Sequence, residues 1–410
     1  MQPINLFFLY FIFYMDSDNT NKFLKDIQIL INFFNKDIKN FLIENTNTVY
    51  DYKSNIMDAL LYYLLNTEKG STHTNSAINI SKNNKVAITR QSLDKRSKHI
   101  GLDELNKIIN EFYEKFLKND SDNFNITDGL NINVYDPDSK KGYKKIKLLS
   151  VCNTKNKPEE LHINKDFYKS ELKIFYDLLN NGYYDETKTF LFDALYFSDK
   201  LTNIFYEKNL KFIARMKTNS VYLTKFKHDL KNNIFSDDYE VTNNKGNKIR
   251  IISYKVNNKI FHMATNLLDK EKYKTDYFKN SYKKRWDVEI YIKITKANTN
   301  LETLKSKDDI KIEMNSKKIL LVTMIYNYII LLYQKYSNTK KSINNSQFIK
   351  SFYNDLIFKI IKRKFNKKEL YFLFSLFFVL YNNSNKGNNE RKAIMPYRCK
   401  WHYKAVFKKI

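Results

Sequence analysis

The sequence predicts an α/β core that carries a β-rich insertion and follows a helical N-terminal region. From about residue 119 onward, short apolar strands alternate with helices, as in α/β domains. Within this part, residues 221–267 contain several strand-like pieces separated by turns rich in Asn, Lys and Gly. Residues 16–118 instead place apolar side chains at helical spacing, most clearly in Phe23–Phe34 and Ile56–Leu65.

The segment Val86–Asn110 stands out in the helical region because a basic helix face follows a short apolar turn. We expect this helix to begin at Thr89 or Ser92. Its basic residues are Arg90, Lys95, Arg96 and Lys98. The pattern is typical both of a helix-turn-helix whose second helix enters a DNA major groove and of an ordinary pair of surface helices. Both interpretations remain open.

The α/β part begins with a strand at Phe124–Val134, whose apolar side chains share one parity with Asp128. The expected elements that follow are a helix at Leu161–Asn181, a strand at Thr189–Phe192, a helix at Ser198–Asn209 and a strand at Leu210–Lys217. After the β-rich block we expect a long helix over Asp276–Asn298, apolar helices near 319–333 and 348–381, and a basic tail.

Composition limits the class of protein. Apolar residues make up 43% of the chain, enough to bury a core, so disorder is not expected. Two cysteines exclude a disulfide framework and a Cys-rich zinc site, and the six histidines show no zinc-ligand spacing. The apolar runs Leu6–Met15, Ile319–Tyr333 and Leu370–Tyr381 are shorter than the roughly 20 residues of a membrane span. The first of these also makes a poor signal peptide, and a chain start at Met15 is equally compatible with the sequence.

The charge balance favours a polyanionic partner. Lys and Arg total 71 against 44 Asp and Glu, which gives a net charge of +27. Such a surplus neutralises nucleic-acid phosphates and releases their counterions. The alternative is that the lysines only solvate the surface.

Two aspartates occupy positions where a carboxylate is expected to bind a cation or to take part in catalysis. Asp128 interrupts the apolar row of its strand, where a carboxylate is costly unless a cation lies opposite. The alternative is that Asp128-Gly129 forms a hairpin turn. Asp193 follows the apolar run Phe190–Phe192, at the carboxyl end of a buried strand, where α/β sheets place functional groups. Its alternative is a plain loop aspartate.

Four polar residues recur on one face of the expected helix at 276–298. At about 100° per residue they form a stripe roughly 60° wide. They are Tyr282, Arg285, Glu289 and Lys296. A solvated face would explain such charges, but Val288, Ile290, Ile292 and Ile294 surround them and predict burial. Beside the stripe, Trp286 can stack on an unpaired base, although a buried core tryptophan is the favoured interpretation.

The spacing Tyr-x2-Arg-x3-Glu-x6-Lys at residues 282–296 resembles the signature of the IS4-type DDE transposases. Two more segments, "ITDGLNINVYDPD" and "TKTFLFDALYFSDKL", are similar to those that carry the first two acidic residues of that family. The resemblance implies that Asp128, Asp193 and Glu289 form the catalytic triad. It also implies an RNase H-like mixed sheet flanked by helices, with the β-rich insertion between the second Asp and the Glu.

The resemblance implies a domain organisation for the whole chain. The expected divisions are a DNA-binding helical region at 1–118, the first part of the catalytic core at 119–220, the insertion at 221–267, the last catalytic helix at 268–310, and a helical region with a basic tail at 311–410.

It further implies that the three acidic residues hold two divalent ions, Mg²⁺ or Mn²⁺, which suit oxygen ligands. Tyr282, Arg285 and Lys296 would hold DNA phosphates. The expected reaction is cleavage at the ends of a mobile element followed by strand transfer. The expected partner is double-stranded DNA, both the terminal inverted repeats and the target, bound by a homodimer inside the cell and without a membrane. The alternatives are a decayed transposase that only binds DNA, and a nuclease without strand transfer.

Overall fold

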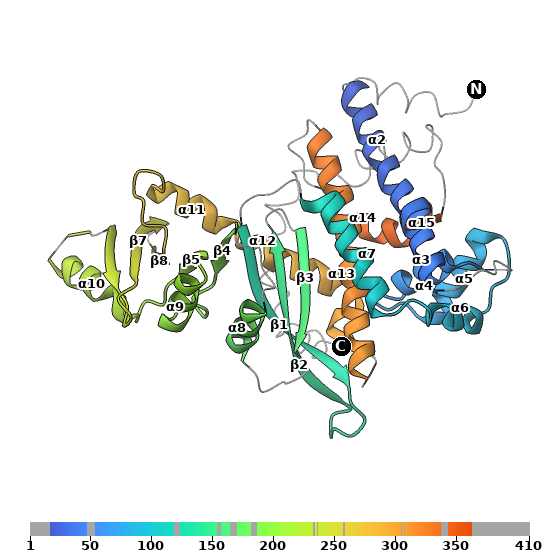
Figure 1. Ribbon diagram of the computed structural model, residues 1–410, viewed down its shortest axis with the longest axis horizontal. Helices are drawn as coiled ribbons and strands as arrows, with labels where there is room; N and C mark the ends of the chain where they lie inside the picture. Colours follow the sequence, from blue (N-terminus) through green and yellow to red (C-terminus); the bar gives the residue numbers. More distant parts are fainter. Residues whose placement is uncertain are drawn as a thin grey trace, which may run out of the picture. The chain divides into compact units, whose positions relative to one another are not determined.

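The computed structural model describes residues 17–46, 54–118, 124–153, 157–164, 170–181, 187–232, 234–235, 237–256, 259–304, 306, 308–337 and 343–362. The chain divides into two compact units. One comprises residues 33–328, and the other combines residues 1–32 with residues 329–410. Figure 1 shows the helices and strands of both units.

A mixed sheet forms the centre of the larger unit. Its first five strands are β1 (Phe124–Tyr135), β2 (Tyr143–Asn153), β3 (Lys157–Asn164), β4 (Thr189–Phe192) and β5 (Lys211–Arg215). They lie in the order β3-β2-β1-β4-β5. The pairs β1–β2 and β2–β3 are antiparallel, whereas β1–β4 and β4–β5 are parallel. This order and these directions are those of an RNase H-like core, which confirms the expected fold class.

Side-chain alternation explains why β1 and β4 occupy the middle of the sheet. In β1, Ile126, Ile132 and Val134 are almost fully buried on one face, as the apolar parity predicted. All four residues of β4 are buried, as expected for a parallel strand covered on both faces. Asp128-Gly129 pairs with Ser150 and Leu149 within the β1–β2 ladder, so the hairpin-turn alternative for Asp128 is wrong.

Helices α8 (Glu171–Asn180) and α9 (Asp199–Glu207) cover one face of the sheet through an aromatic core. Phe175 packs edge-on against Phe192, with ring centroids 5.0 Å apart, and Phe205 packs edge-on against Phe190 at 5.2 Å. The Ser198 side chain accepts a hydrogen bond from the Leu201 backbone N–H and caps α9, as expected. The expected helix at Leu161–Asn181 is partly wrong because its first residues belong to β3. The helix begins only after the cap at Ser170.

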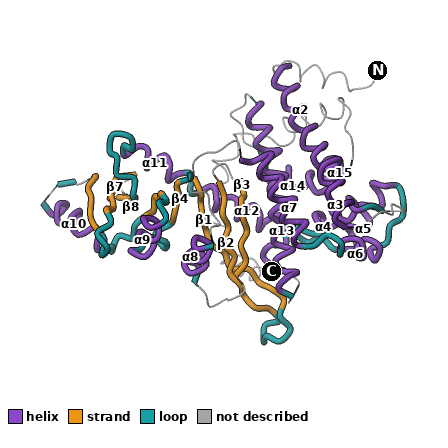
Figure 2. The backbone as a smooth tube through the Cα atoms, viewed as in Figure 1, coloured by secondary structure: helices purple, strands orange, loops and turns teal. Residues whose placement is uncertain are grey.

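The insertion extends the sheet beyond β5. Its strands are β6 (Asp238–Thr242), β7 (Lys248–Val256) and β8 (Lys259–Thr265), and β8 pairs antiparallel with β5 (Figure 2). A β-rich insertion is therefore confirmed, but its first part is helical. Residues Val221–Leu223 form the 3-10 turn η4 and Thr224–Lys231 form α10, where Phe226 is buried against the sheet core.

The expected helix over Asp276–Asn298 is two helices. They are α11 (Thr275–Lys283) and α12 (Trp286–Asn298), separated by Lys284 and Arg285. Tyr282 and Arg285 therefore lie at the junction, and only Glu289 and Lys296 lie within α12. After α12 come the 3-10 turn η5 (Asn300–Glu302) and β9 (Thr303–Leu304), which pairs with β1.

The N-terminal part of the larger unit is helical in its described residues. It contains η1 (Phe33–Ile38), α3 (Lys39–Thr46), α4 (Ile56–Leu65), α5 (His73–Asn84), α6 (Arg90–Ser97), α7 (Leu102–Phe112) and η2 (Tyr113–Leu117). Thr89 caps α6, so the first of the two expected starts is the one used. The turn after α4 joins the catalytic core, because the Lys69 N–H donates to the Asn298 carbonyl at 2.9 Å. The expected division into functional domains stays a prediction.

The smaller unit contains α2 (Ser17–Asn32), the end of α13 (Asp309–Tyr336), α14 (Asn345–Ser351), η6 (Phe352–Leu356) and α15 (Ile357–Lys362). The Tyr336 hydroxyl donates to Asp26 at 2.7 Å within this unit. Among the described residues, α13 is the one helix long and apolar enough to cross a membrane, and 83% of its apolar window is buried in the protein. That burial is typical of a core helix. The apolar runs at 6–15 and 370–381 and the basic tail lie outside the described residues.

A buried ion pair joins strands β7 and β6 within the insertion. Arg250 is 1% exposed and holds Asp238 through two hydrogen bonds, at 2.9 and 2.7 Å. We expect Asp238→Ala to lower the free energy of unfolding by about 3–5 kcal/mol, because it leaves the guanidinium buried without its partner charge. Urea denaturation measures this. Lys270→Ala removes the exposed second partner of Asp238, at 3.6 Å, and should cost less than about 1 kcal/mol. Equal losses would contradict this account.

Candidate active site

Strand pairing brings the two aspartates together. The parallel register of β1 and β4 ends at Ile126 opposite Leu191. Asp128 and Asp193 each follow two residues later on neighbouring strands, whose spacing is about 4.8 Å. The alternation of side chains places Asp128 with Ile126, and directs Asp193 to the same face as Leu191. The parallel β1–β4 pairing thus ends two residues before both aspartates, with Asp128 inside β1 and Asp193 directly after β4.

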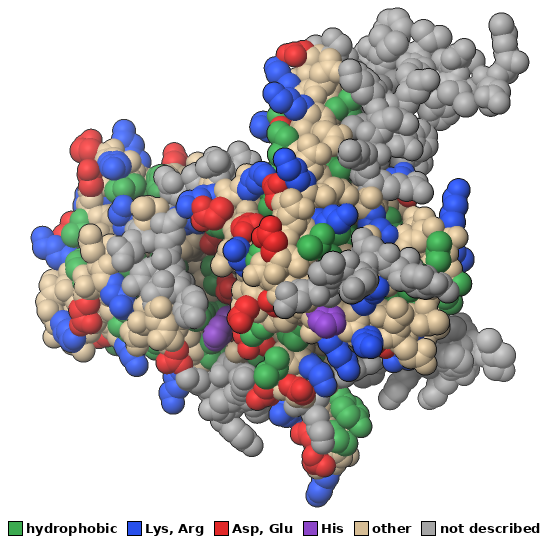
Figure 3. Space-filling view, turned by 45° about the vertical axis from the view of Figure 1, so that its right-hand side comes forward, with side chains coloured by type: hydrophobic (Ala, Val, Ile, Leu, Met, Phe, Trp, Pro, Cys, Tyr) green, Lys and Arg blue, Asp and Glu red, His purple; other side chains and the backbone are tan. Residues whose placement is uncertain are grey.

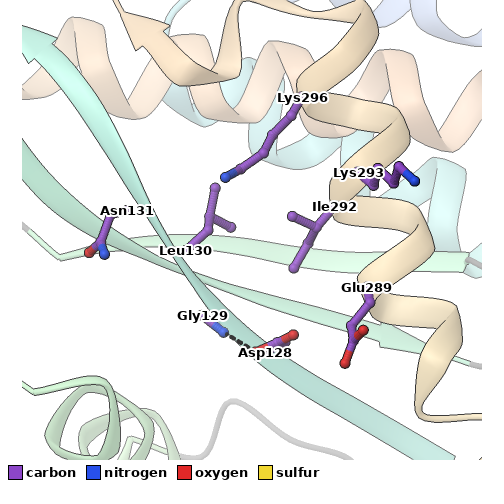
Figure 4. Close-up of a pocket in the computed structure, with 8 residues that line it drawn as sticks. All are labelled: Asp128, Gly129, Leu130, Asn131, Glu289, Ile292, Lys293 and Lys296. Carbon is purple, nitrogen blue, oxygen red and sulfur yellow. Dashed lines mark hydrogen bonds between the residues drawn. The ribbon is translucent and has the colours of Figure 1, made fainter. Parts of the chain in front are cut away.

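Helix α12 supplies the third acidic residue. Asp128 and Glu289 both line an open pocket of about 510 Å³ between β1 and α12. The other lining residues are Gly129, Leu130, Asn131, Ile292, Lys293 and Lys296. Figure 4 shows the Asp128 and Glu289 carboxylates in this space, with Lys296 extended toward β1 and Lys293 pointing away. The pocket is wide enough to admit a phosphate group with water around it.

The charge around Asp128 is unbalanced. Burial, with the neighbouring Glu171 carboxylate as the second cause, raises the pKa of Asp128 from 3.8 to about 6. The Gly129 N–H, which donates to Asp128 at 2.9 Å, and the charge of Arg285 oppose the rise only in part. Among the described residues, no basic side chain forms an ion pair with Asp128, Asp193 or Glu171. The site therefore holds negative charge that a cation would stabilise.

Arg285 is the basic group nearest to these carboxylates. It is 7% exposed, forms an ion pair with Glu289, and lies over the Tyr282 ring at 5.7 Å from its centroid. The Nε of Arg285 and the hydroxyl of Tyr282 are buried without a hydrogen-bond partner. Burial raises the pKa of Tyr282, so its hydroxyl stays protonated and can donate. Unused donors of this kind are costly unless a ligand oxygen accepts from them.

Two members of the sequence pattern have different surroundings from those expected. Lys296 is part-exposed and lies 3.7 Å from Glu302, away from the acidic cluster, although it lines the pocket. Trp286 is 55% exposed, so its interpretation as a buried core residue is wrong. Arg285 lies 5.5 Å from its ring centroid. Ile290 is also 43% exposed, and α12 is therefore half-buried rather than largely buried.

The acidic residues fit Mg²⁺ in kind. Mg²⁺ prefers oxygen ligands, keeps several waters and is commonly held by one or two carboxylates together with substrate phosphates. Asp128 and Asp193 supply that minimum. In the part of the chain that the structure describes, no three Asp, Glu, His or Cys side chains are grouped closely enough to hold a metal. Glu289 is instead engaged by Arg285, and would have to leave it to join the other two.

Sequence reasoning missed Glu171 as a member of this site. It is the first residue of α8, where an acidic side chain ordinarily serves the helix dipole. Its carboxylate lies against the backbone of Gly129, in the space that a Cβ atom there would occupy. Because the fold alone brings the start of α8 to β1, no local signal in the sequence could have shown this contact.

The comparison with protein families decides the class. A family model described as "Transposase DDE domain" matches residues 120–328, which is just over half of the chain.

The chain belongs to the transposase DDE domain family.

The matched region of this transposase-family chain contains all three acidic residues, Asp128 in β1, Asp193 directly after β4 and Glu289 in α12. No curated protein matches the sequence. Among solved structures, the chain is similar to piggyBac transposase in a synaptic complex with hairpin DNA, determined by cryo-electron microscopy. The identity is 11% and the TM-score 0.45, over 92% of this chain and 90% of that one.

The raised pKa of Asp128 predicts how the stability of the folded protein depends on pH. Above pH 6 its charge opposes folding, and this cost fades as the pH falls from about 6 toward the ordinary value of 3.8. We expect Asp128→Asn to raise the melting temperature at pH 8, without divalent ions, by about 2–8 °C. The gain should shrink toward pH 5. Asp138→Asn, in the exposed β1–β2 turn, should change nothing. A destabilised Asp128→Asn protein at pH 8 would show that the carboxylate is already compensated.

Proposed function

We propose that this chain is a transposase that uses Asp128, Asp193 and Glu289 to cut DNA at the ends of a mobile element and to join the freed 3′ ends to target DNA. It would do so with two bound Mg²⁺ or Mn²⁺ ions. The observations that support the proposal are the register of β1 and β4, which ends two residues before both Asp128 and Asp193, and the pocket that Asp128 and Glu289 line. The family match supports the same reaction class.

A bound pair of divalent ions activates the attacking oxygen and stabilises the leaving oxygen. Asp128 inside β1 and Asp193 directly after β4 would hold them, and Glu289 would join when Arg285 turns to a phosphate. Arg285 is suited to that exchange, because its planar fork binds a carboxylate or a phosphate equally well. Tyr282 would donate its unused hydroxyl to the same phosphate. Lys296 would add a point charge from about two turns farther along α12 than Glu289.

We expect the β1–β2 hairpin to contact the DNA backbone. The residues Tyr143–Ile146 of β2 pair with β1 but lie beyond the β2–β3 register, so the hairpin continues past the end of β3 (Figure 1). Its exposed basic residues are Lys140, Lys141, Lys144 and Lys145. On the face shown in Figure 3, basic and acidic side chains are otherwise interspersed. The hairpin, the net charge of +27 and the exposed start of α6 support DNA as the partner, bound by a homodimer.

Asp193→Asn tests the division between chemistry and binding. We expect DNA cleavage to fall at least about a hundredfold, because metal ligation needs the charge, while DNA affinity and its salt dependence remain. The assay is Mg²⁺-dependent cleavage of DNA that carries the flanks of the gene, with binding measured by fluorescence anisotropy. Asp199→Asn, on α9, is the matched control. Equal loss of binding and cleavage would contradict separate roles. Cleavage without joined products would identify a nuclease instead.

Arg285→Lys tests the phosphate role of the buried guanidinium. Lysine keeps the charge but loses the planar fork, so we expect single-turnover cleavage to slow by about ten- to a hundredfold, equivalent to about 1.5–3 kcal/mol. Lys296→Arg should be milder, because a point charge is replaced by a cation that still reaches phosphate. Lys283→Arg, exposed at the end of α11 and outside the pocket lining, should leave the rate unchanged. A wild-type rate for Arg285→Lys would make this residue purely structural.

A further inference from the structure

Glu171 lies where the two aspartate-bearing segments separate. Backbone pairing between β1 and β4 ends at Ile126 and Leu191, so no hydrogen-bond ladder holds Asp128 and Asp193 at a set spacing. Two contacts of Glu171 cross this gap. One reaches the segment of Asp128, and the other reaches the segment of Asp193.

The first contact is with the Asp128–Gly129 peptide. A Cβ atom on Gly129 would lie 2.2 Å from Cδ and 2.3 Å from Oε2 of Glu171, so the carboxylate rests directly on this glycine. The Gly129 N–H also donates to the Asp128 carboxylate at 2.9 Å. Any side chain at position 129 would push the Glu171 carboxylate away from the peptide that orients Asp128.

The second contact is with the turn that carries Asp193. The Tyr196 hydroxyl donates a hydrogen bond to Oε1 of Glu171. Tyr196 is 1% exposed, and its backbone N–H donates to the Asp193 carbonyl at 3.1 Å. Stacking of Tyr196 on Phe192, with ring centroids 5.2 Å apart, holds the ring rigidly beside β4. The side chain of Glu171 is therefore linked to the Asp193 turn through one well-ordered tyrosine.

We propose that Glu171 is a positioning residue for DNA cleavage, holding the Asp128–Gly129 peptide and the Asp193–Tyr196 turn at one spacing through Gly129 and Tyr196. The inference rests on the proposed function, because the spacing matters only if both aspartates act on one phosphodiester. What this role requires is the shape of the Glu171 side chain and its acceptor oxygen. The negative charge of Glu171 is not required.

The test compares Tyr196→Phe, Glu171→Ala and Glu171→Gln in the Mg²⁺-dependent cleavage assay with the full chain. Loss of one hydrogen bond to a carboxylate predicts about tenfold slower cleavage for Tyr196→Phe and for Glu171→Ala. The double variant Tyr196→Phe with Glu171→Ala should cleave about as slowly as Glu171→Ala alone, because Tyr196 and Glu171 act as one unit. Glu171→Gln keeps the acceptor and should stay within about threefold of wild type.

Gly129 provides a second test, which adds atoms at the contact with Glu171 instead of removing them. Gly129→Ala should slow cleavage by about tenfold in the wild-type background, by displacing the carboxylate. In the Glu171→Ala background the displaced atoms are absent, so Gly129→Ala should add no further loss. The matched control is Tyr222→Phe, which removes a tyrosine hydrogen bond to Asp199 elsewhere in the same sheet domain and should not change the rate.

Mn²⁺ binding, followed by electron paramagnetic resonance without DNA, is the readout that a merely structural role would not move. We expect several-fold weaker binding in Tyr196→Phe and Glu171→Ala and no change in Tyr222→Phe. Wild-type cleavage and Mn²⁺ affinity in Tyr196→Phe would overturn the proposal. So would a Glu171→Gln protein as slow as Glu171→Ala, since the charge would then be what matters. If the wild type cuts no DNA but the Mn²⁺ pattern holds, the cleavage function fails, and what stands is that Glu171 holds the two aspartates at a metal-binding spacing.

Discussion

The parallel pairing of β1 with β4 is the constraint on which the site depends. It ends two residues before each aspartate, so both carboxylates lie just past the last shared hydrogen bonds of neighbouring strands. If the β1–β4 pairing continued past the two aspartates, it would bury their carboxylates in the sheet. If it ended earlier, the strands would diverge and the carboxylates would lie too far apart to share a ligand. The antiparallel β1–β2 ladder holds β1 from its other side through Asp128 itself. The third carboxylate, Glu289, reaches the same place from α12 across the pocket.

A second consequence of this geometry is that the buried charge of Asp128 lowers the stability of the folded protein. Asp128 carries a pKa of about 6 because it is buried beside Glu171, and the Gly129 N–H and the charge of Arg285 offset this only in part. Arg285 is itself committed to Glu289 in the absence of a ligand. The arrangement suits a protein that receives cations and a phosphate together. The phosphate would bind the Arg285 guanidinium, and the cations would bind the carboxylates, including that of the released Glu289. Folding stability is then lower than it would be with neutral residues at these positions.

The sequence predicted the core well because its signals were local. The alternation in Phe124–Val134 and the apolar run before Asp193 identified both strands. The helical spacing from Tyr282 to Lys296 identified α12, although the expected single helix over Asp276–Asn298 is α11 and α12. Errors arose where tertiary contacts decided the outcome. The chain at 161–164 forms strand β3 because β2 offers it an edge, although the residues also fit a helix. Trp286 was expected in the core, yet α12 leaves it 55% exposed. Glu171 could not be found, since only the fold brings it to Gly129.

The most direct test of the central claim is a diffraction experiment on the full chain with bound Mn²⁺ and a DNA end, recorded at the manganese absorption edge. The account predicts an anomalous peak between Asp128 and Asp193, with carboxylate oxygens at about 2.2 Å, and a Glu289 side chain released from Arg285. Manganese bound elsewhere, with Arg285 still paired to Glu289 and the two aspartates unligated, would contradict it.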